Sequence, residues 1–344
     1  MTWSVRGRGG RQLGHFTLAI VAVVVLLAMN GCKSKSLNGR DTSPPNETTI
    51  GRLDADTRSR VLTEVATLIR DHYADQEVGK SLADTILALL HQGQFDPVVD
   101  AGSLVTQIMA VIRTKVPDRH FDFSMRLEPE NQPTQSRSGT RSEHGLKTTR
   151  MLKDNIAYLE FDGLPGDDAS LSFVEQALAA LPEVDALIID IRNNIGGSGD
   201  MVVLLCSHLV EAGTLLYDYR DRSGASPGEM RARHYGRRFG PAVPVYILTG
   251  GATLSAAEAL AYVLQDYERA RIVGQRTPGM ANPSRAFSIG DDFTITIPFL
   301  LFRYGESRTT FAGVGIVPDR LVPAESALDV ALAEISASVP SRVY

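Results

Sequence analysis

One serine in the sequence stands in a setting that suits acyl-transfer chemistry. Residues 245–258 have the pattern of a strand, a glycine-containing turn and then Ser255, which opens a helix. A serine placed there has its hydroxyl at the rim of a sheet, and the backbone amide of Ala256 after it is free to donate a hydrogen bond. The same pattern also fits a helix N-cap, because Glu258 stands three residues after Ser255 and completes a capping box. The two roles are compatible.

A second turn, earlier in the chain, carries two adjacent glycines. Residues 184–197 show a buried-strand pattern that runs into Gly196 and Gly197, and an apolar, helix-like segment follows at 201–210. Glycines at a strand-to-helix junction let backbone N–H groups approach a ligand closely, at the positive end of the helix. The turn therefore suits an oxyanion hole or an anion site, although an ordinary turn has the same pattern.

The composition excludes several other functions. The 344 residues have a formal net charge of -5, and the basic residues are spread along the chain, so no polycationic surface for nucleic acid is expected. The two cysteines, Cys32 and Cys206, are too few and too differently placed for a disulfide framework or a zinc site. Cys206 lies in an apolar run and is expected to be a buried thiol. We expect neither a metal nor a cofactor.

Residues 1–32 resemble a bacterial lipoprotein signal peptide. Three arginines precede an apolar run at 16–29, which is short for a membrane span and suits a signal-peptide core. The run ends in a sequence that resembles a lipobox, which predicts lipidation of Cys32; an uncleaved anchor is the alternative. The lipobox therefore predicts a lipid-anchored protein of the cell envelope. An aspartate after the cysteine marks retention at the inner membrane in some lipoproteins, and none follows Cys32. We therefore expect the outer membrane, with the protein facing the periplasm. Residues 33–52 are rich in Ser, Pro, Asn and Thr and predict a flexible tether.

The rest of the chain divides into a helical part and a part with strands. At 53–127 apolar residues recur at helical spacing, which predicts a small domain of three helices. Residues 128–150 are rich in polar residues, Pro and Gly and predict a linker. At 151–338 short β-branched runs alternate with helical patterns, which predicts an α/β sheet domain. Strands are expected at 156–161, 186–191, 243–248, 270–273 and 293–297, and helices at 171–181 and 256–264.

Both turns resemble motifs of the tail-specific, or C-terminal processing, serine protease superfamily. The motifs lie at 190–197 (DIRNNIGG) and 255–258 (SAAE), and further similar stretches lie at 261–265, 272–279 and 313–319. The resemblance implies a ClpP/crotonase-like α/β core in which Ser255 is the nucleophile. It also implies that the amides of Gly196 or Gly197, together with that of Ala256, hold the oxyanion.

A histidine indicates the branch of this superfamily. The best-known branch uses a Ser-Lys dyad and a PDZ domain, but no lysine follows Lys153, and too few residues separate His120 from the core for a PDZ domain. Residues 118–120 (DRH) instead resemble the Asp-x-His motif of the branch that includes tricorn protease and the interphotoreceptor retinoid-binding protein. This resemblance implies that His120 is the general base. Five other histidines are expected to be surface or packing residues: His72, His91, His144, His208 and His234.

The sequence leaves open which acid would orient His120. Tricorn-like members carry a serine just before the histidine and often a glutamate before a Gly-Val-Gly motif, and here these positions are Arg119 and Ala312. Three carboxylates are candidates: Asp118, Glu258 and Glu306. Asp118 could instead only fix the turn before His120, and Glu258 could instead only cap its helix.

Together these features predict a serine-type peptidase that cleaves peptide or protein segments in the cell envelope through a Ser-His acyl-enzyme mechanism. Its expected partners are the peptide substrate and, through lipidated Cys32, the membrane. Two alternatives use the same fold: a non-catalytic module that binds an apolar, retinoid-like or lipid-like ligand, and an esterase. The apolar run 299–302 could line a pocket in the first alternative, or could form a buried strand.

Overall fold

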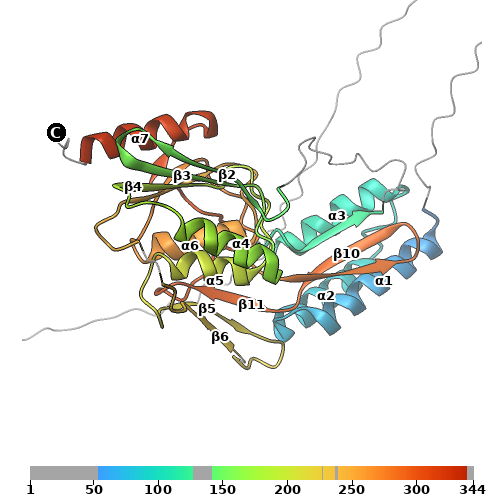
Figure 1. Ribbon diagram of the computed structural model, residues 1–344. Coiled ribbons are helices and arrows are strands. Elements are labelled where there is room, and N and C mark those ends of the chain that lie inside the picture. Colours follow the sequence, from blue (N-terminus) through green and yellow to red (C-terminus); the bar gives the residue numbers. More distant parts are fainter. Residues whose placement is uncertain (1–52, 127–141, 227, 237–238, 339–344) are drawn as a thin grey trace, which may run out of the picture. The chain divides into compact units, whose positions relative to one another are not determined.

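The computed structural model describes residues 53–126, 142–226, 228–236 and 239–338 (Figure 1). The chain divides into a unit of residues 1–48, outside the described part, and a unit of residues 49–344 that contains all of it. The expected signal peptide, the lipidated Cys32, the tether and residues 128–141 of the expected linker lie outside the described residues. None of the helices within the described ranges is long and apolar enough to cross a membrane.

Three helices form the N-terminal part, as the apolar spacing predicts. They are α1 (Ala55–His72), α2 (Gln76–His91) and α3 (Ala101–Arg113). Each begins after an aspartate whose carboxylate accepts the amide hydrogen of the residue three positions later, at 2.7 to 2.9 Å. Such N-caps satisfy donors that a helix leaves free at its start. The three helices bury their apolar faces in one shared core.

A small antiparallel sheet completes this helical core. Its strands are β1 (Asp122–Met125), β10 (Phe293–Pro298) and β9 (Ser284–Ile289), in the order β1-β10-β9. Phe293 is fully buried, and its ring stacks on that of Phe123 with the centroids 5.3 Å apart. The hairpin 284–298 therefore packs with the helices, although it lies within the range 151–338 that the sequence predicts for the α/β domain. The alternation of apolar residues predicts a strand, but it does not say which core that strand enters.

The α/β part is built around one six-stranded sheet. Its order is β12-β8-β7-β4-β3-β2, and all neighbours are parallel except the pair β3 and β2. The strands are β2 (Leu146–Leu152), β3 (Ile156–Phe161), β4 (Ala186–Asp190), β7 (Val245–Thr249), β8 (Arg271–Gly274) and β12 (Arg320–Leu321). β2 begins inside the segment 128–150, which the sequence predicts to be a linker. The strand was not expected there, because most of its side chains are exposed and it lacks an apolar pattern that would reveal it.

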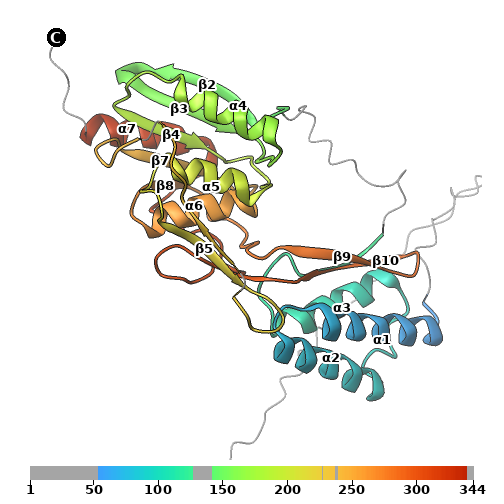
Figure 2. The ribbon, with the colours of Figure 1, turned by 60° about the horizontal axis from the view of Figure 1, so that its bottom comes forward.

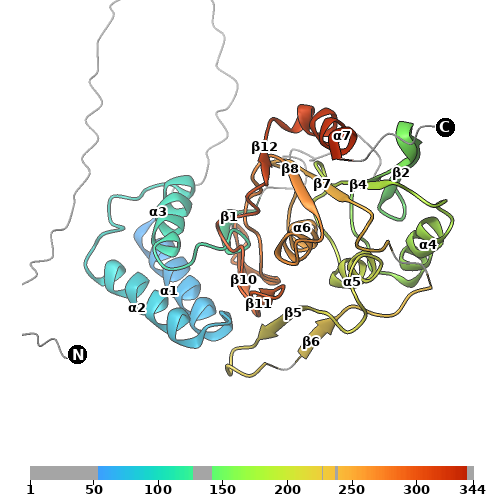
Figure 3. The same cartoon turned by 90° about the vertical axis from the view of Figure 1, so that its left-hand side faces the viewer.

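Helices cover both faces of this sheet (Figure 3). On one face lie α4 (Asp168–Ala179), α5 (Gly199–Ser207) and α6 (Ala256–Asp266), and on the other lies α7 (Ala327–Ser338). Side chains alternate accordingly: Ile189 and Ile247 enter the core under the three helices, whereas Ile188 and Tyr246 pack with α7. Two single-turn 3-10 helices lie at Lys153–Asn155 and Ala324–Ser326.

A third sheet lies beside α5 and α6 (Figures 2 and 3). Its strands are β11 (Leu301–Tyr304), β5 (Leu215–Arg220) and β6 (Gly228–Arg231), in the order β11-β5-β6 with antiparallel pairing. The apolar run 299–302 thus enters β11, and its last residue, Phe302, also lines a cavity. The run therefore contributes to a strand, but its side chains are only half-buried, so the expected buried strand is wrong in its burial.

Candidate active site

Ser255 lies in the turn between β7 and the start of α6. Thr253 fixes this turn, because its hydroxyl donates to the Ile191 carbonyl at 2.7 Å and accepts the Gly250 amide at 2.9 Å. Ser255 has φ 56° and ψ -120°, a conformation that costs a non-glycine residue about 1–3 kcal/mol. It differs from the extended backbone of an ordinary N-cap. Strain of this kind in a strand-to-helix turn is typical of an exposed nucleophile.

The glycine turn after β4 lies directly against Ser255. A Cβ atom added to Gly196 would come within 2.8 Å of the Ser255 Cβ and 3.0 Å of the Ala256 amide nitrogen. Gly196 also has a φ of 92°, which disfavours any residue with a side chain. Glycine at this position therefore lets the two turns touch.

The structure narrows the set of expected oxyanion donors. The Gly196 amide donates to the side-chain oxygen of Asn194 at 2.8 Å, so this amide is already used. In the part of the chain that the structure describes, the amides of Gly197 and Ala256 have no hydrogen-bond acceptor. Ala256 is the first residue of α6, where the helix leaves amides free and positive potential is greatest. These two amides remain as donors for an oxyanion.

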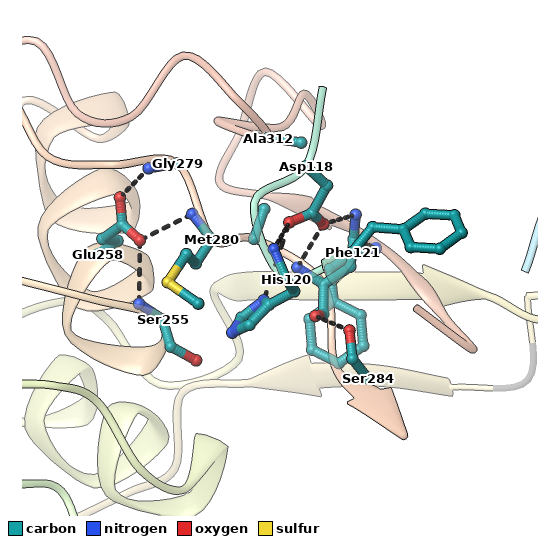
Figure 4. Close-up of polar contacts among 12 residues, drawn as sticks. Asp118, His120, Phe121, Ser255, Glu258, Gly279, Met280, Ser284 and Ala312 are labelled. Carbon is teal, nitrogen blue, oxygen red and sulfur yellow. Dashed lines mark hydrogen bonds and ion pairs between the residues drawn. The ribbon is translucent and has the colours of Figure 1, made fainter. Parts of the chain in front are cut away.

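Glu258 is fully buried behind Ser255 and accepts four hydrogen bonds, of which Figure 4 shows those from Ser255, Gly279 and Met280. One oxygen accepts the amides of Ser255 and Met280, both at 2.9 Å, and the other accepts the Thr277 hydroxyl at 2.6 Å and the Gly279 amide at 2.7 Å. Burial raises the pKa of this carboxyl, and the four hydrogen bonds oppose that shift. None of its described contacts involves His120. The sequence left Glu258 open as orienting acid or cap, and the contacts give it a structural role at the serine turn.

His120 is presented by a loop that follows α3. The Arg113 guanidinium, in the last turn of α3, donates to the carbonyl oxygens of Asp118 at 2.5 Å and Phe121 at 2.8 Å. These bonds hold the loop on both sides of the histidine. The His120 side chain is 18% exposed, and its ring points toward the side of the site where the Ser255 side chain lies (Figure 4). No hydrogen bond joins these two side chains within the described ranges, and catalytic hydrogen bonds often tighten only when substrate binds.

Asp118 is the candidate acid that lies next to His120. Its Oδ1 accepts the His120 backbone amide at 2.8 Å, and its Oδ2 accepts the backbone amide of Asn282 at 3.1 Å and the side-chain amide at 2.5 Å. The Asp118 Oδ1 is 3.9 Å from the His120 Nδ1, beyond hydrogen-bond range. That nitrogen is buried and has no hydrogen-bond partner among the described residues. No pattern in the sequence points to Asn282, so its contact with Asp118 was missed.

Burial and charge oppose each other in this pair. Burial lowers the pKa of the His120 imidazole below its usual 6.5, and the negative charge of Asp118 counteracts part of this shift. Burial likewise raises the pKa of the Asp118 carboxyl, against the hydrogen bond from the His120 amide and the charge of the ring. A neutral imidazole is the form that accepts a proton. The lowered pKa therefore favours the form that a general base requires at neutral pH.

The third candidate acid, Glu306, is not brought to the site. It is exposed in the turn after β11, where its charge acts on Tyr267 at the end of α6. Its described interactions do not include His120. Ala312, which replaces the glutamate of tricorn-like members, carries no carboxylate, so Asp118 is the acid that the described structure offers to His120.

An apolar cavity opens beside Ser255. Its volume is about 260 Å³, and it is bounded on one side by Gly197 and Ala256 and on the other by side chains of the third sheet. The rings of Tyr217, Phe302 and Tyr304 pack on one another with centroids 5.2 to 5.8 Å apart. The remaining lining residues are Gly199, Asp200, Val202, Met230, Ala259, Ala281 and Pro283. A cavity of this size and lining suits one apolar side chain next to the serine.

Two family models match consecutive parts of the chain. The model of peptidase family S41 matches residues 155–322, and the model of the N-terminal domain of peptidase S41 in eukaryotic IRBP matches residues 51–159. The chain belongs to peptidase family S41. The S41 model spans the glycine turn and Ser255, and the N-terminal model spans His120, so the two models together include both sides of the site.

Individual S41 relatives are distant. A carboxy-terminal-processing protease from Bartonella bacilliformis is 27% identical over 138 residues, which are 39% of this chain and 30% of that protein. The chain spans about a third of the length of the curated relatives that it matches. Among solved structures, a putative peptidase from Parabacteroides merdae has a TM-score of 0.58 at 15% identity, covering 85% of this chain and 100% of that one. A lipoprotein from Streptococcus agalactiae has a TM-score of 0.53 at 16% identity, with the same two coverages. Both share the fold of this chain.

Replacement of Glu258 by Gln tests the structural role of the buried carboxylate. The new NH2 group cannot accept, so two buried donors lose their acceptor, at about 1–3 kcal/mol each. We expect the free energy of unfolding, measured with urea, to fall by at least about 2 kcal/mol. The control is Glu183→Gln in an exposed loop, which should leave stability unchanged. Equal stability of the two variants would contradict the assignment.

Proposed function

We propose that this S41-family chain is a serine peptidase that cleaves peptide or protein segments through a Ser-His acyl-enzyme mechanism. The observation that carries the proposal is the strained Ser255, packed against Gly196 and lining one cavity with Gly197 and Ala256, whose amides have no acceptor among the described residues. An N-cap alone needs neither the strain nor the contact with the glycine turn. A nucleophile uses both, because its hydroxyl must stand clear and the oxyanion must find donors.

The proposed reaction proceeds in two stages. His120 takes the proton from the Ser255 hydroxyl as the oxygen attacks the peptide carbonyl, and the amides of Gly197 and Ala256 stabilise the resulting oxyanion. The tetrahedral species collapses, the imidazolium gives its proton to the departing amine, and the acyl-enzyme remains. Water, deprotonated by His120, then attacks the ester and releases the acid and the free serine. Asp118 stabilises the imidazolium through its charge.

The cavity beside Ser255 supports an apolar residue on the acyl side of the cleaved bond. Its wall is formed by aromatic and aliphatic side chains, and Asp200 is the one charged side chain among the lining residues. The same aromatic wall is the observation that favours the second candidate function, an apolar-ligand binding module. An esterase would use the same nucleophile. A carrier has no use for an activated serine, so serine reactivity separates the carrier from both enzymes.

We also propose that the chain is lipid-anchored through Cys32 in the cell envelope, at the outer membrane and facing the periplasm. The support is the lipobox-like sequence before Cys32 and the polar tether at 33–52, which would let the folded part stand off a membrane surface. Substrates would then be segments of envelope or exported proteins.

Labelling with a fluorophosphonate probe tests the nucleophile. The wild type should be labelled, Ser255→Ala should not, and His120→Ala should react at least about 1000-fold more slowly, because the serine loses its base. His91→Ala, an exposed histidine, is the matched control and should react like the wild type. An unlabelled wild type that binds apolar ligands would favour the carrier, and labelling of Ser255→Ala would refute the assignment.

The pH dependence of kcat/KM tests whether the charge of Asp118 acts on His120. Because His120 must be neutral to act and burial lowers its pKa, the acidic limb of kcat/KM should lie below pH 6.5. Asp118→Asn removes the charge that raises this pKa, so the limb should move to still lower pH while the rate at neutral pH falls. Asp122→Asn, at the start of β1, should leave the limb in place, because Asp122 is not among the charges that shift the pKa of His120. A shift to higher pH in Asp118→Asn would contradict the proposed role.

Replacement of Cys32 by Ser tests the anchor. Lipidation needs the thiol, so the variant should lose metabolic labelling with radioactive palmitate and move from the membrane fraction to the soluble envelope fraction. Cys206→Ser changes a thiol that is buried within α5, and it should keep the palmitate label. Continued labelling of the Cys32→Ser variant would show that the lipid is attached elsewhere.

A further inference from the structure

The third sheet supplies one whole wall of the cavity beside Ser255. Tyr217, Met230, Phe302 and Tyr304 all line the cavity. In the register of the sheet, Tyr217 lies opposite Met230 on one neighbour and opposite Tyr304 on the other, so these side chains share a face. The width of the cavity therefore depends on where this sheet lies, and β6 is one of the two edge strands of the sheet.

The turn between β5 and β6 is ordered by its own hydrogen bonds. The Asp221 carboxylate accepts the amide of Ser223 at 2.9 Å and its hydroxyl at 2.6 Å, and the Gly224 amide donates to the Asp221 carbonyl at 2.9 Å. Gly224 has a φ of 78°, which such a turn requires. This arrangement presents Arg222 at the tip of the hairpin in a defined position.

Arg222 attaches the hairpin to the end of α1. Its guanidinium donates to the carbonyl of Tyr73 at 2.7 Å and to the carbonyl of Arg70. Carbonyls at the end of a helix have no partner within the helix, and a cation there is favoured by the helix dipole. α1 belongs to the helical core, whereas β5 packs with the α/β core, and Figure 2 shows the hairpin reaching toward the helices.

The same helix end also supports the loop of His120. The Tyr73 ring stacks on Phe121 with the centroids 5.4 Å apart, and Phe121 is the residue after His120. Both the cavity wall and the histidine loop therefore rest on the end of α1. The two bonds of Arg222 join the tip of the hairpin to the helical core, whereas its base is held by the pairing of β5 with β11 and by the burial of Leu216 and Tyr217 in the α/β core.

We propose that Arg222 is a positioning residue that holds the hairpin wall closed on the acyl-side residue of the substrate. The inference rests on the proposed peptidase function. A wall contacts an apolar side chain equally in the bound substrate and in the transition state, so it lowers KM and leaves kcat unchanged. A substrate with glycine at the acyl side does not fill the cavity and does not use the wall.

Two activated esters test this role: the p-nitrophenyl esters of N-acetyl-leucine and N-acetyl-glycine. In Arg222→Ala, kcat/KM for the leucine ester should fall about tenfold, through KM, while the glycine ester changes less than twofold. Arg222→Lys should recover part of the loss, because an ammonium still donates to one carbonyl. Arg220→Ala, an exposed arginine of the same hairpin, should behave like the wild type. Equal losses for both esters, no loss, or no recovery by lysine would each overturn the inference.

Hydrogen exchange decides the inference independently of activity. The amides of Gly228–Arg231 should exchange at least tenfold faster in Arg222→Ala than in the wild type or in Arg220→Ala, since the tip of the hairpin then loses its bonds to the end of α1. Unchanged exchange would show that Arg222 does not hold the wall. If the fluorophosphonate leaves the wild type unlabelled, the peptidase proposal fails, and the exchange measurement still shows whether the hairpin depends on Arg222.

Discussion

The buried carboxylate of Glu258 is the contact on which the rest of the site depends. Four donors converge on it, and they come from two segments that must meet beside the serine: the start of α6 and the loop 277–280 after β8. A buried carboxylate without partners would cost several kcal/mol, so each donor that reaches it stabilises both segments. The chain then continues to Ala281, in the cavity wall, and Asn282, which binds Asp118. A displacement of the Glu258 side chain would therefore disturb the serine turn, the cavity wall and the histidine loop together.

Close backbone contacts are the second constraint, and they explain why glycine-rich motifs surround the site. A Cβ at Gly313 would lie 2.5 Å from the Pro117 carbonyl oxygen, and one at Gly315 would overlap the Thr277 carbonyl. The Gly-Val-Gly stretch therefore fits between the histidine loop and the loop that binds Glu258. The Asp190 carboxylate has a comparable structural role, since it binds the Arg192 guanidinium and the Tyr158 hydroxyl. These motif residues position the site without touching its reacting atoms.

The sequence predicted the elements whose burial produces a periodic pattern. The parallel strands β3, β4, β7 and β8 and the helices α4 and α6 lie where their apolar residues indicated, because buried faces need such residues. β2, β5 and β6 were missed, since their patterns are short or mixed with charges. The family resemblance drew attention to Ser255 and His120. It did not reveal Asn282 or Arg222, because their partners lie far away in the sequence and no local spacing encodes such contacts.

The site combines groups from two cores, and this arrangement limits how Asp118 can act. Ser255 rests on the α/β core, and the loop of His120 rests on the helical core. The Asp118 Oδ1 accepts the backbone amide of His120 at 2.8 Å, which fixes the turn and keeps this oxygen 3.9 Å from the ring nitrogen. Its Oδ2 is occupied by Asn282, which ties the histidine loop to the loop that carries Glu258's donors. One carboxylate thus joins the two halves of the site and sets the charge beside His120. Both Asp118 oxygens are already used by contacts that fix the loop. In the proposed mechanism, Asp118 would therefore stabilise an imidazolium at His120 through its charge and not through a hydrogen bond to the ring.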